Sequence, residues 1–410
     1  MALPGVRTVL KDRFYILSRT DIPTGPRLCI LGIRDTVDGT SDGNVAVPDL
    51  DPYLATNEQK VINAFGEGSA LHRAYVEAVA GGALQIYLVG LPSSTTDGDL
   101  VSTANGNVLD LAMEAAETIL PDMIVPWGRG GHPTEYSDPA ATLSSPGFGF
   151  YADNSSSTST SLAKRVSDWC ATITDRSHPV FAVMGIKPFL PATEYAGESL
   201  TATNLATHTA LSNLVNKNAI DNGQFLSVVA AEIRPLGYDT DWGYSNGAAL
   251  YAGFLSQLRS WSASTGKLVF NATAIRYNPT RSQQDAMSTK GVVPVALDFS
   301  RRATYVDGVT FASEGSDYSR LTTLRIVFDA VQLVRQVSQG FIGEAATLQH
   351  RNAFETAITA GLRGMQQAGA LLDSGFVVSY IASENKAVVD LVLQPAFELR
   401  NIEIQVAVNL

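Results

Sequence analysis

Cysteine is nearly absent from this sequence, which has only Cys29 and Cys170 among 410 residues. Both stand beside apolar residues, and this setting predicts two buried, reduced thiols. Two cysteines cannot supply a disulfide framework or a cysteine-based zinc cluster. We therefore expect the fold to be held by its apolar core and to form in a reducing compartment.

The sequence also lacks an excess of basic over acidic residues, and it lacks a long run of apolar residues. Its formal net charge is -11, which argues against nucleic acid as a main partner, because phosphate binding favours a basic surface. No stretch is long enough to span a bilayer, so no direct membrane insertion is expected. The first residues show no basic segment followed by an apolar one, which predicts no secretory signal.

The chain has the composition of a globular protein, with 45% hydrophobic and 17% charged residues. Its length predicts one to three domains. From Arg27 onward, short apolar strands alternate with amphipathic helices, a pattern typical of a largely parallel α/β sheet. Strands are expected at residues 28–33, 84–89, 123–127, 179–186 and 225–233, and helices at 57–65, 69–80, 107–120, 162–174, 203–214 and 247–261.

The last hundred residues predict a separate α+β arrangement. A helix is expected from residue 321, with one apolar face formed by Leu324, Val327, Phe328, Val331 and Val334. A second amphipathic helix carries Phe354, Ile358, Gly361, Leu362 and Met365 on one face. Alternating patterns then predict strands at 376–381 and 387–393. Gly361 and Gly364 each cost a helix about 1 kcal/mol against Ala, which indicates a closely packed backbone there.

Both ends of the chain predict extended segments. In the last strand, apolar residues fall on odd numbers up to Leu399 and on even numbers afterwards, so the pattern predicts a bulge or hinge at Arg400 and Asn401. The strand residues concerned are Phe397, Leu399, Ile402, Ile404, Val406 and Val408. This strand either pairs inside its own domain or completes a neighbour's sheet by strand addition.

The N-terminal segment has the same two interpretations. Val6, Thr8 and Leu10 fall on one face of an extended arm, which ends at a break formed by Pro23, Gly25 and Pro26. The segment is either a first edge strand or an arm on a short linker.

One motif suggests enzymatic chemistry. Residues 243–247 match the G-x-S-x-G elbow of hydrolases, with Ser245 as nucleophile. The polar, glycine-flanked segment before it is a poor strand, and His350 is the only later histidine for a triad. The alternative is a turn that begins a helix, with Ser245 or Asn246 as N-cap. The five histidines show no metal-binding spacing, so we expect no metal and no cofactor.

Charged side chains accompany the two C-terminal helices, namely Arg320, Arg325, Arg335, Arg351, Glu355 and Arg363. They form either a solvated helix face or a charged contact with a partner. The sequence leaves both possibilities open.

The order of these elements resembles that of contractile-tail sheath proteins of bacteriophages and related injection machines. The stretches that carry the resemblance are Pro4-Gly5-Val6, Gly81-Gly82 before a strand, Lys290-Gly291-Val292, residues 306–310, and the closing run Pro395-Ala396-Phe397-Glu398-Leu399-Arg400-Asn401-Ile402. The family usually has Gly-Arg-Gly, Trp and Arg-Thr in the lead-in to the first C-terminal helix. Here Ser300-Arg301-Arg302 and Gly308-Val309-Thr310 stand instead.

The resemblance implies four parts: an N-terminal arm (1–26), an outer α/β domain of sandwich type (27–285), an inner α+β domain (286–400) and an exchanged C-terminal strand (401–410). It implies a non-enzymatic subunit that polymerises in stacked rings around a tail tube and contracts to drive the tube through the host envelope. The implied partners are further copies, the tube, the baseplate and the tail terminator. The implied location is the virion tail, after assembly in the host cytoplasm. Another phage baseplate or structural protein is the alternative within the same class.

Overall fold

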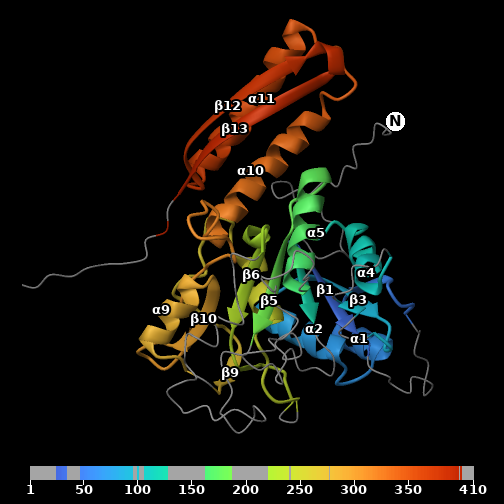
Figure 1. Cartoon of the computed structure of the whole chain (residues 1–410), viewed down its shortest axis with the longest axis vertical. Coiled ribbons are helices and arrows are strands. Elements are labelled where there is room, and N and C mark those ends of the chain that lie inside the picture. Colours follow the sequence, from blue (N-terminus) through green and yellow to red (C-terminus); the bar gives the residue numbers. More distant parts are fainter. Residues whose placement is uncertain are drawn as a thin grey trace, which may run out of the picture. The chain divides into compact units, whose positions relative to one another are not determined.

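The computed structural model describes residues 25–34, 47–95, 99–100, 106–127, 162–186, 220–239, 242–276, 278–396 and 398. The chain divides into two compact units. Among the described residues, unit 1 comprises 260–265 and 322–398, and unit 2 comprises 25–259 and 266–321 (Figure 1).

Unit 2 is built on one mixed sheet of nine described strands in the order β2-β3-β1-β4-β5-β6-β10-β11-β8. The six strands from β3 to β10 in this order run parallel to their neighbours, and β2, β11 and β8 pair antiparallel at the two edges. The prediction of a largely parallel sheet is confirmed. The strands are β1 (Arg27–Ile33), β2 (Pro52–Ala55), β3 (Gln85–Leu91), β4 (Met123–Trp127), β5 (Phe181–Ile186), β6 (Leu226–Ala230), β8 (Lys267–Leu268), β10 (Val292–Leu297) and β11 (Ala303–Tyr305). A short separate pair joins β7 (Ile233–Pro235) to β9 (Ala272–Ile275).

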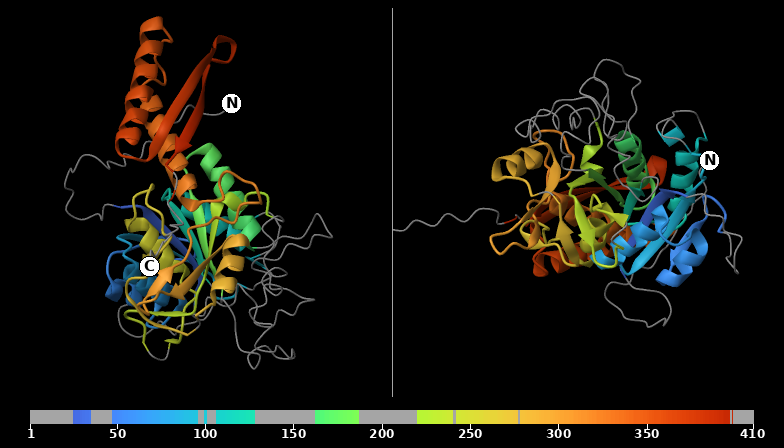
Figure 2. Two further views of the ribbon diagram at one scale, coloured as in Figure 1. Left: turned by 90° about the vertical axis from the view of Figure 1, so that its left-hand side faces the viewer. Right: turned by 90° about the horizontal axis from the view of Figure 1, so that it is seen from below.

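Helices cover both faces of this sheet, as successive β-α-β crossovers require (Figure 2). One face packs against α2 and α8, and the other against α4, α5 and α9. The helices of unit 2 are α1 (Glu58–Phe65), α2 (Ala70–Gly81), α4 (Val108–Glu117), α5 (Leu162–Arg176), α8 (Ala248–Gln257) and α9 (Arg281–Thr289). Cys29 and Cys170 are buried, free thiols, as predicted, in the core that the sheet forms with α4, α5 and α9. Burial raises the pKa of both thiols well above the usual range.

Gly81 explains why a glycine pair stands at the end of α2. A Cβ built on Gly81 would lie 2.2 Å from the carbonyl oxygen of Leu250 and 3.0 Å from the Cα of Gly253. The backbones of α2 and α8 therefore touch, and only glycine fits on both sides of the crossing.

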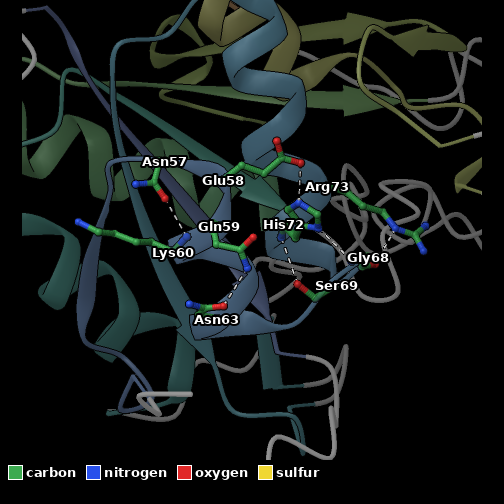
Figure 3. Close-up of polar contacts among 9 residues, drawn as sticks. All are labelled: Asn57, Glu58, Gln59, Lys60, Asn63, Gly68, Ser69, His72 and Arg73. Atoms are coloured by element: carbon green, nitrogen blue, oxygen red, sulfur yellow. Dashed lines mark hydrogen bonds and ion pairs between the residues drawn. The ribbon is translucent and has the colours of Figure 1, made fainter. Parts of the chain in front are cut away.

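Local capping sets the starts of α1 and α2 (Figure 3). The Asn57 side chain accepts a hydrogen bond from the Lys60 amide at 2.9 Å, and the Ser69 hydroxyl accepts one from the His72 amide at 3.2 Å. Each cap satisfies a backbone donor that the first helical turn leaves open. The buried His72 ring accepts the Gly68 amide at Nδ1 (2.9 Å), so its Nε2 carries the proton that faces Glu58 (3.2 Å).

Unit 1 contains two long helices and a hairpin. These are α10 (Leu321–Gln339, whose first residue belongs to unit 2), α11 (Leu348–Gln367), β12 (Leu371–Ile381) and β13 (Lys386–Pro395). The two helices and two strands predicted for this part of the chain are all present. No helix among the described residues is long and apolar enough to cross a membrane.

Two expectations differ from the structure in detail. The boundary placed at residues 285 and 286 falls inside α9, and residues 292–305 supply β10 and β11 to the sheet of unit 2. The strand expected at 225–233 is interrupted, because its first residue closes a 3-10 turn and a gap separates β6 from β7. The helix expected at 203–214 lies outside the described residues.

Candidate assembly site

The core of unit 1 lies between the two helices and one face of the hairpin. Its buried members come from all three parts, and Ile326, Ala330, Val334, Phe354, Ile358, Leu362 and Leu371 are among them. The predicted apolar face of α11 is confirmed at Phe354, Ile358 and Leu362. The predicted face of α10 is confirmed only in part. Leu324 and Val334 are buried, whereas Val327, Phe328 and Val331 are half-buried, and Ile326 and Ala330 are buried instead. Apolar residues lie on more than one side of α10, so periodicity alone did not identify all the buried positions.

The hairpin has one covered and one open face. Phe376, Val378, Val389 and Leu391 turn toward the core. On the other face, Val377 is 64% exposed and Val392 is 73% exposed. Among the described residues, β12 and β13 pair only with each other. A two-stranded sheet of this length is marginal alone, and its two outer edges present backbone donors and acceptors to any incoming strand.

The chain beyond β13 is anchored at Glu398. The amide of Ala396 donates to the carbonyl of Ala370 at 3.0 Å. The Glu398 carboxylate then accepts hydrogen bonds from the hydroxyls of Thr265 (3.2 Å) and Thr322. These contacts join the segment after β13 to the loop at Thr265 and to the start of α10.

Most of the predicted arm and hinge residues lie outside the described residues. These are Val6, Thr8, Leu10, Pro23, Phe397, Leu399, Arg400, Asn401, Ile402, Ile404, Val406 and Val408. Gly25 is exposed and Pro26 is half-buried where the described chain begins. The roles given to all of these residues remain predictions.

Arg320 has a local partner. Its guanidinium lies 2.5 Å from a carboxylate oxygen of Asp307, whose side chain is buried. The Gly308 amide donates to the same oxygen. This ion pair ties the residue before α10 to the loop after β11, so a structural role accounts for Arg320 without an external partner.

Arg351 and Glu355 form a second cluster with Tyr380, which joins α11 to β12. The Arg351 guanidinium lies over the Tyr380 ring, 4.4 Å from its centroid, and the Tyr380 hydroxyl donates to Glu355 at 3.4 Å. Burial first, and the nearby Glu355 carboxylate second, raise the pKa of Tyr380 above its usual value. These side-chain contacts hold α11 against β12 of the hairpin.

The other three predicted charges differ in exposure. Arg325 and Arg335 are half-buried on α10, whereas Arg363 is exposed on α11. Arg320, Arg351 and Glu355 thus contact residues of their own chain, and Arg363 is the one of the six whose side chain is exposed in the described structure. A contact of any of them with a tube remains a prediction.

The two glycines of α11 have different surroundings. A Cβ on Gly361 would lie 2.5 Å from Cδ2 of Leu333, whereas one on Gly364 would meet nothing within 4 Å. The expected close backbone is therefore absent at both positions among the described residues. A side chain of α10 approaches Gly361 instead.

Ser245 is not placed as a nucleophile. It is 1% exposed, its hydroxyl donates to Glu77 at 2.5 Å, and it accepts the Gly247 amide at 2.9 Å. Its backbone bridges to Ile233. A catalytic serine needs an open face and a base, whereas the described partners of the Ser245 hydroxyl are Glu77 and the Gly247 amide. The His350 ring hydrogen-bonds to the Ala345 carbonyl (2.7 Å), just before α11. The N-cap of α8 is Gly247, so the capping role given to Ser245 or Asn246 is wrong as well.

Glu77 is the buried group that sequence patterns missed. It accepts hydrogen bonds from Ser245, from the Tyr238 hydroxyl at 3.0 Å and from the Leu250 amide at 3.2 Å. Burial raises the pKa of Glu77 to about 7, although these hydrogen bonds lower it. The carboxyl therefore joins α2 to the start of α8. No group of three or more potential ligands for a metal occurs among the described residues.

Sequence comparison finds no match to any protein-family model and none to any curated protein. Structure comparison does find matches along the whole chain. A chain of the anti-feeding prophage baseplate is 12% identical with a TM-score of 0.62, and the match covers 100% of both chains.

Two further matches are named as sheath. A chain of the PVC extracellular contractile injection system sheath complex in its contracted state is 12% identical, with a TM-score of 0.61 and coverage of 99% and 98%. A sheath tail protein from Listeria innocua is 9% identical, with a TM-score of 0.57 and coverage of 91% and 93%. The protein therefore has the fold of contractile-tail sheath proteins, as its resemblance in sequence predicted.

Proposed function

We propose that this chain is a structural subunit of a contractile-tail sheath, and that it works by self-assembly rather than by catalysis. The observation that carries the proposal is the agreement of fold over nearly the whole chain with sheath proteins of known contractile machines. Agreement in one domain would leave the function open, because common domains serve many roles. Here the match extends over both units, including the hairpin of unit 1.

The proposed link between copies is strand exchange at the hairpin. The alternating C-terminal segment, with Ile402, Ile404, Val406 and Val408, adds to an outer edge of β12 or β13 of a neighbour. The N-terminal arm with Val6, Thr8 and Leu10 does the same at the other edge. Added strands satisfy the open backbone groups of the edges, and their alternating side chains extend the apolar open face on which Val377 and Val392 lie.

Movement in this proposal occurs at the chain ends. Glu398, the last described residue, is held by the hydroxyls of Thr265 and Thr322, and Arg400 and Asn401 follow as the hinge. At the other end, Pro23, Gly25 and Pro26 form the matching joint. Rigid units joined by flexible strands can change from an extended to a contracted array while every link is kept.

The remaining partners follow from the same role. Stacked rings surround a tail tube, with the baseplate at one end and the terminator at the other, in a virion or related particle. Among the predicted charges, Arg363 is exposed and is the side chain we would place toward the tube. A contact that must slide should be small and polar.

A related role as a baseplate component has one supporting observation, since one matching chain belongs to a baseplate structure. Image symmetry separates the two roles. A sheath subunit gives tubes of uniform diameter with a helical repeat, whereas a baseplate component gives closed rings or plates.

The testing experiment is electron microscopy of the purified full chain beside a chain that lacks residues 402–410. We expect tubes from the full chain and dispersed subunits from the shortened one, with equal thermal stability of the two. Tubes from the shortened chain would refute the linking role of the C-terminal strand.

A further inference from the structure

The two edges of the sheet in unit 2 carry charge of opposite sign. Residues 266–305, which supply β8, β9, α9, β10 and β11, contain six Lys or Arg and two Asp or Glu, a net charge of +4. Residues 47–68, which supply β2 and α1, contain four Asp or Glu and one Lys, a net charge of -3. Residues 266–305 are thus basic in a chain whose net charge is -11.

These two segments lie at opposite ends of one sheet. The strand order begins with β2 and ends with β8, and seven strands stand between them. Figure 1 shows α9 and β10 on one side of unit 2 and α1 and β3 on the other. The unit therefore has a basic edge, defined as residues 266–305 without the β9 strand, and an acidic edge, defined as residues 47–68.

Local ion pairs neutralise only part of each edge. In the basic segment, Arg276 lies 3.6 Å from Glu232, Arg281 lies 3.5 Å from Asp285 and Arg302 lies 3.1 Å from Asp298. Lys267, Lys290 and Arg301 form no ion pair with the described residues. On the acidic edge, Asp49 pairs with Arg34 at 2.9 Å, whereas Asp51 and Glu67 are exposed and form no ion pair within the described part of the chain.

The basic edge also carries apolar anchors. Phe299, at the turn between β10 and β11, is 98% exposed, and Phe270, just beyond β8, is 58% exposed. The turn is preorganised, because the Asp298 carboxylate accepts the Arg302 amide at 2.8 Å and its guanidinium at 3.1 and 3.2 Å. An exposed aromatic side chain on a fixed turn that also carries Arg301 and Arg302 resembles the aromatic and arginine clusters found at interface hot spots.

We propose that the basic edge of one copy binds the acidic edge of the next, as a lateral contact between subunits of the same ring. A second copy of this chain is the occupant that the charges select, since each copy brings both complementary surfaces. The contact is head-to-tail, and a head-to-tail contact whose rotation closes generates a ring. This inference rests on the proposed self-assembly and adds the surface that orients neighbours.

The contact supplies orientation more than strength. Charges on partly exposed edges steer association and are screened beyond a Debye length of about 8 Å at physiological salt. Strand exchange holds the copies together in the proposed function, and the charged edges set which way each subunit faces before the strands are exchanged. The two links can therefore be tested separately.

The experiment is a charge swap in the full chain, with assembly followed by sedimentation and electron microscopy at 50 and 500 mM salt. One variant reverses the basic edge (Lys267→Glu with Arg301→Glu), a second reverses the acidic edge (Asp51→Lys with Glu67→Lys), and a third carries all four changes. Arg176→Glu, on the exposed end of α5 away from both edges, is the matched control for Arg301→Glu.

We expect each single-edge variant to raise the concentration for half-assembly about tenfold at low salt. In the variant with all four substitutions, this concentration should return toward the wild-type value. Equal assembly of all variants, or no recovery of assembly in the variant with all four substitutions, would overturn the proposed contact while the sheath function stands. If the wild-type chain itself forms no ordered assembly, then the proposed function fails instead. Circular dichroism melting of each variant separates lost contact from lost folding.

Discussion

The hydroxyl of Thr265 donates a hydrogen bond to Oε2 of Glu398 at 3.2 Å, and this contact holds the end of the described chain against a loop more than a hundred residues earlier. Thr322, at the start of α10, donates to the other oxygen of the same carboxylate. The Glu398 side chain thus connects three segments of unit 1. The hinge proposed at Arg400 and Asn401 begins two residues beyond this anchor, and the strand proposed to reach a neighbour follows it.

Replacement of this anchor should loosen unit 1. Glu398→Ala leaves the buried Thr322 hydroxyl without its acceptor, and an unmet buried group costs roughly 1–3 kcal/mol. We expect a lower free energy of unfolding in urea, followed by circular dichroism. Asp390→Ala, on the open face of β13, is the matched control and should change little.

Replacement of Arg320 and replacement of Arg363 should change the stability by different amounts, because Arg320 pairs with a buried carboxylate and Arg363 is exposed. Arg320→Ala removes the cation from the buried Asp307 carboxylate and should cost roughly 2–3 kcal/mol of stability, less than a fully buried pair because Arg320 is partly exposed. Arg363→Ala should stay within about 0.5 kcal/mol. Thermal melting of both proteins measures the difference, and equal effects would contradict the distinction.

The glycines of α11 offer a second matched pair. Gly364→Ala should stabilise the protein by roughly 0.5–1 kcal/mol, because alanine favours the helix and the new methyl group meets open space. Gly361→Ala should gain less, since its methyl group displaces the Leu333 side chain. Denaturant midpoints of the two variants test this order. A larger gain at Gly361 would show that Leu333 moves without cost.

Glu77 should make stability depend on pH. Its pKa in the folded protein, about 7, lies above the ordinary carboxyl value of 4.5. The folded state therefore favours the protonated form. The stability that this proton contributes is fully present below about pH 4.5 and is lost as the pH rises through 7.

Glu77→Gln should remove this dependence, because the amide keeps the shape and cannot titrate. We expect the wild-type free energy of unfolding to fall by roughly 1–3 kcal/mol more than that of the variant between pH 5 and pH 8. Urea titrations at each pH provide the measurement. Parallel curves for the two proteins would mean that Glu77 is charged throughout this range.

Periodicity was sufficient for the framework of the fold. Alternating apolar strands and amphipathic helices gave the parallel sheet, and short apolar strands such as β1 and β4, buried on both faces, leave little ambiguity of type. The phase of α10 was less certain, because Val327, Phe328 and Val331 are as apolar as the residues that α11 covers. The choice between stripes depends on tertiary packing.

The polar contacts between residues far apart in the chain could not be predicted from a single sequence. Glu77 and Ser245 are separated by 168 residues, and Asp307 and Arg320 meet through a bend between β11 and α10. No local pattern marks either pair. The Gly-x-Ser-x-Gly match at 243–247 was discounted from its poor preceding strand, but the burial of Ser245 could not be predicted, since it depends on α2, a distant helix.

The most direct test of the central claim uses two populations with one engineered cysteine each. Val406→Cys stands in the C-terminal strand, and Ser379→Cys or Gln394→Cys stands on β12 or β13, while the native cysteines are buried. The populations are mixed, assembled and oxidised, so that a disulfide between Val406→Cys and a hairpin cysteine can only join different copies. We predict a band of two linked chains with at least one of the two hairpin positions. Ordered tubes that give only single chains with both positions would contradict the claim that copies share this strand.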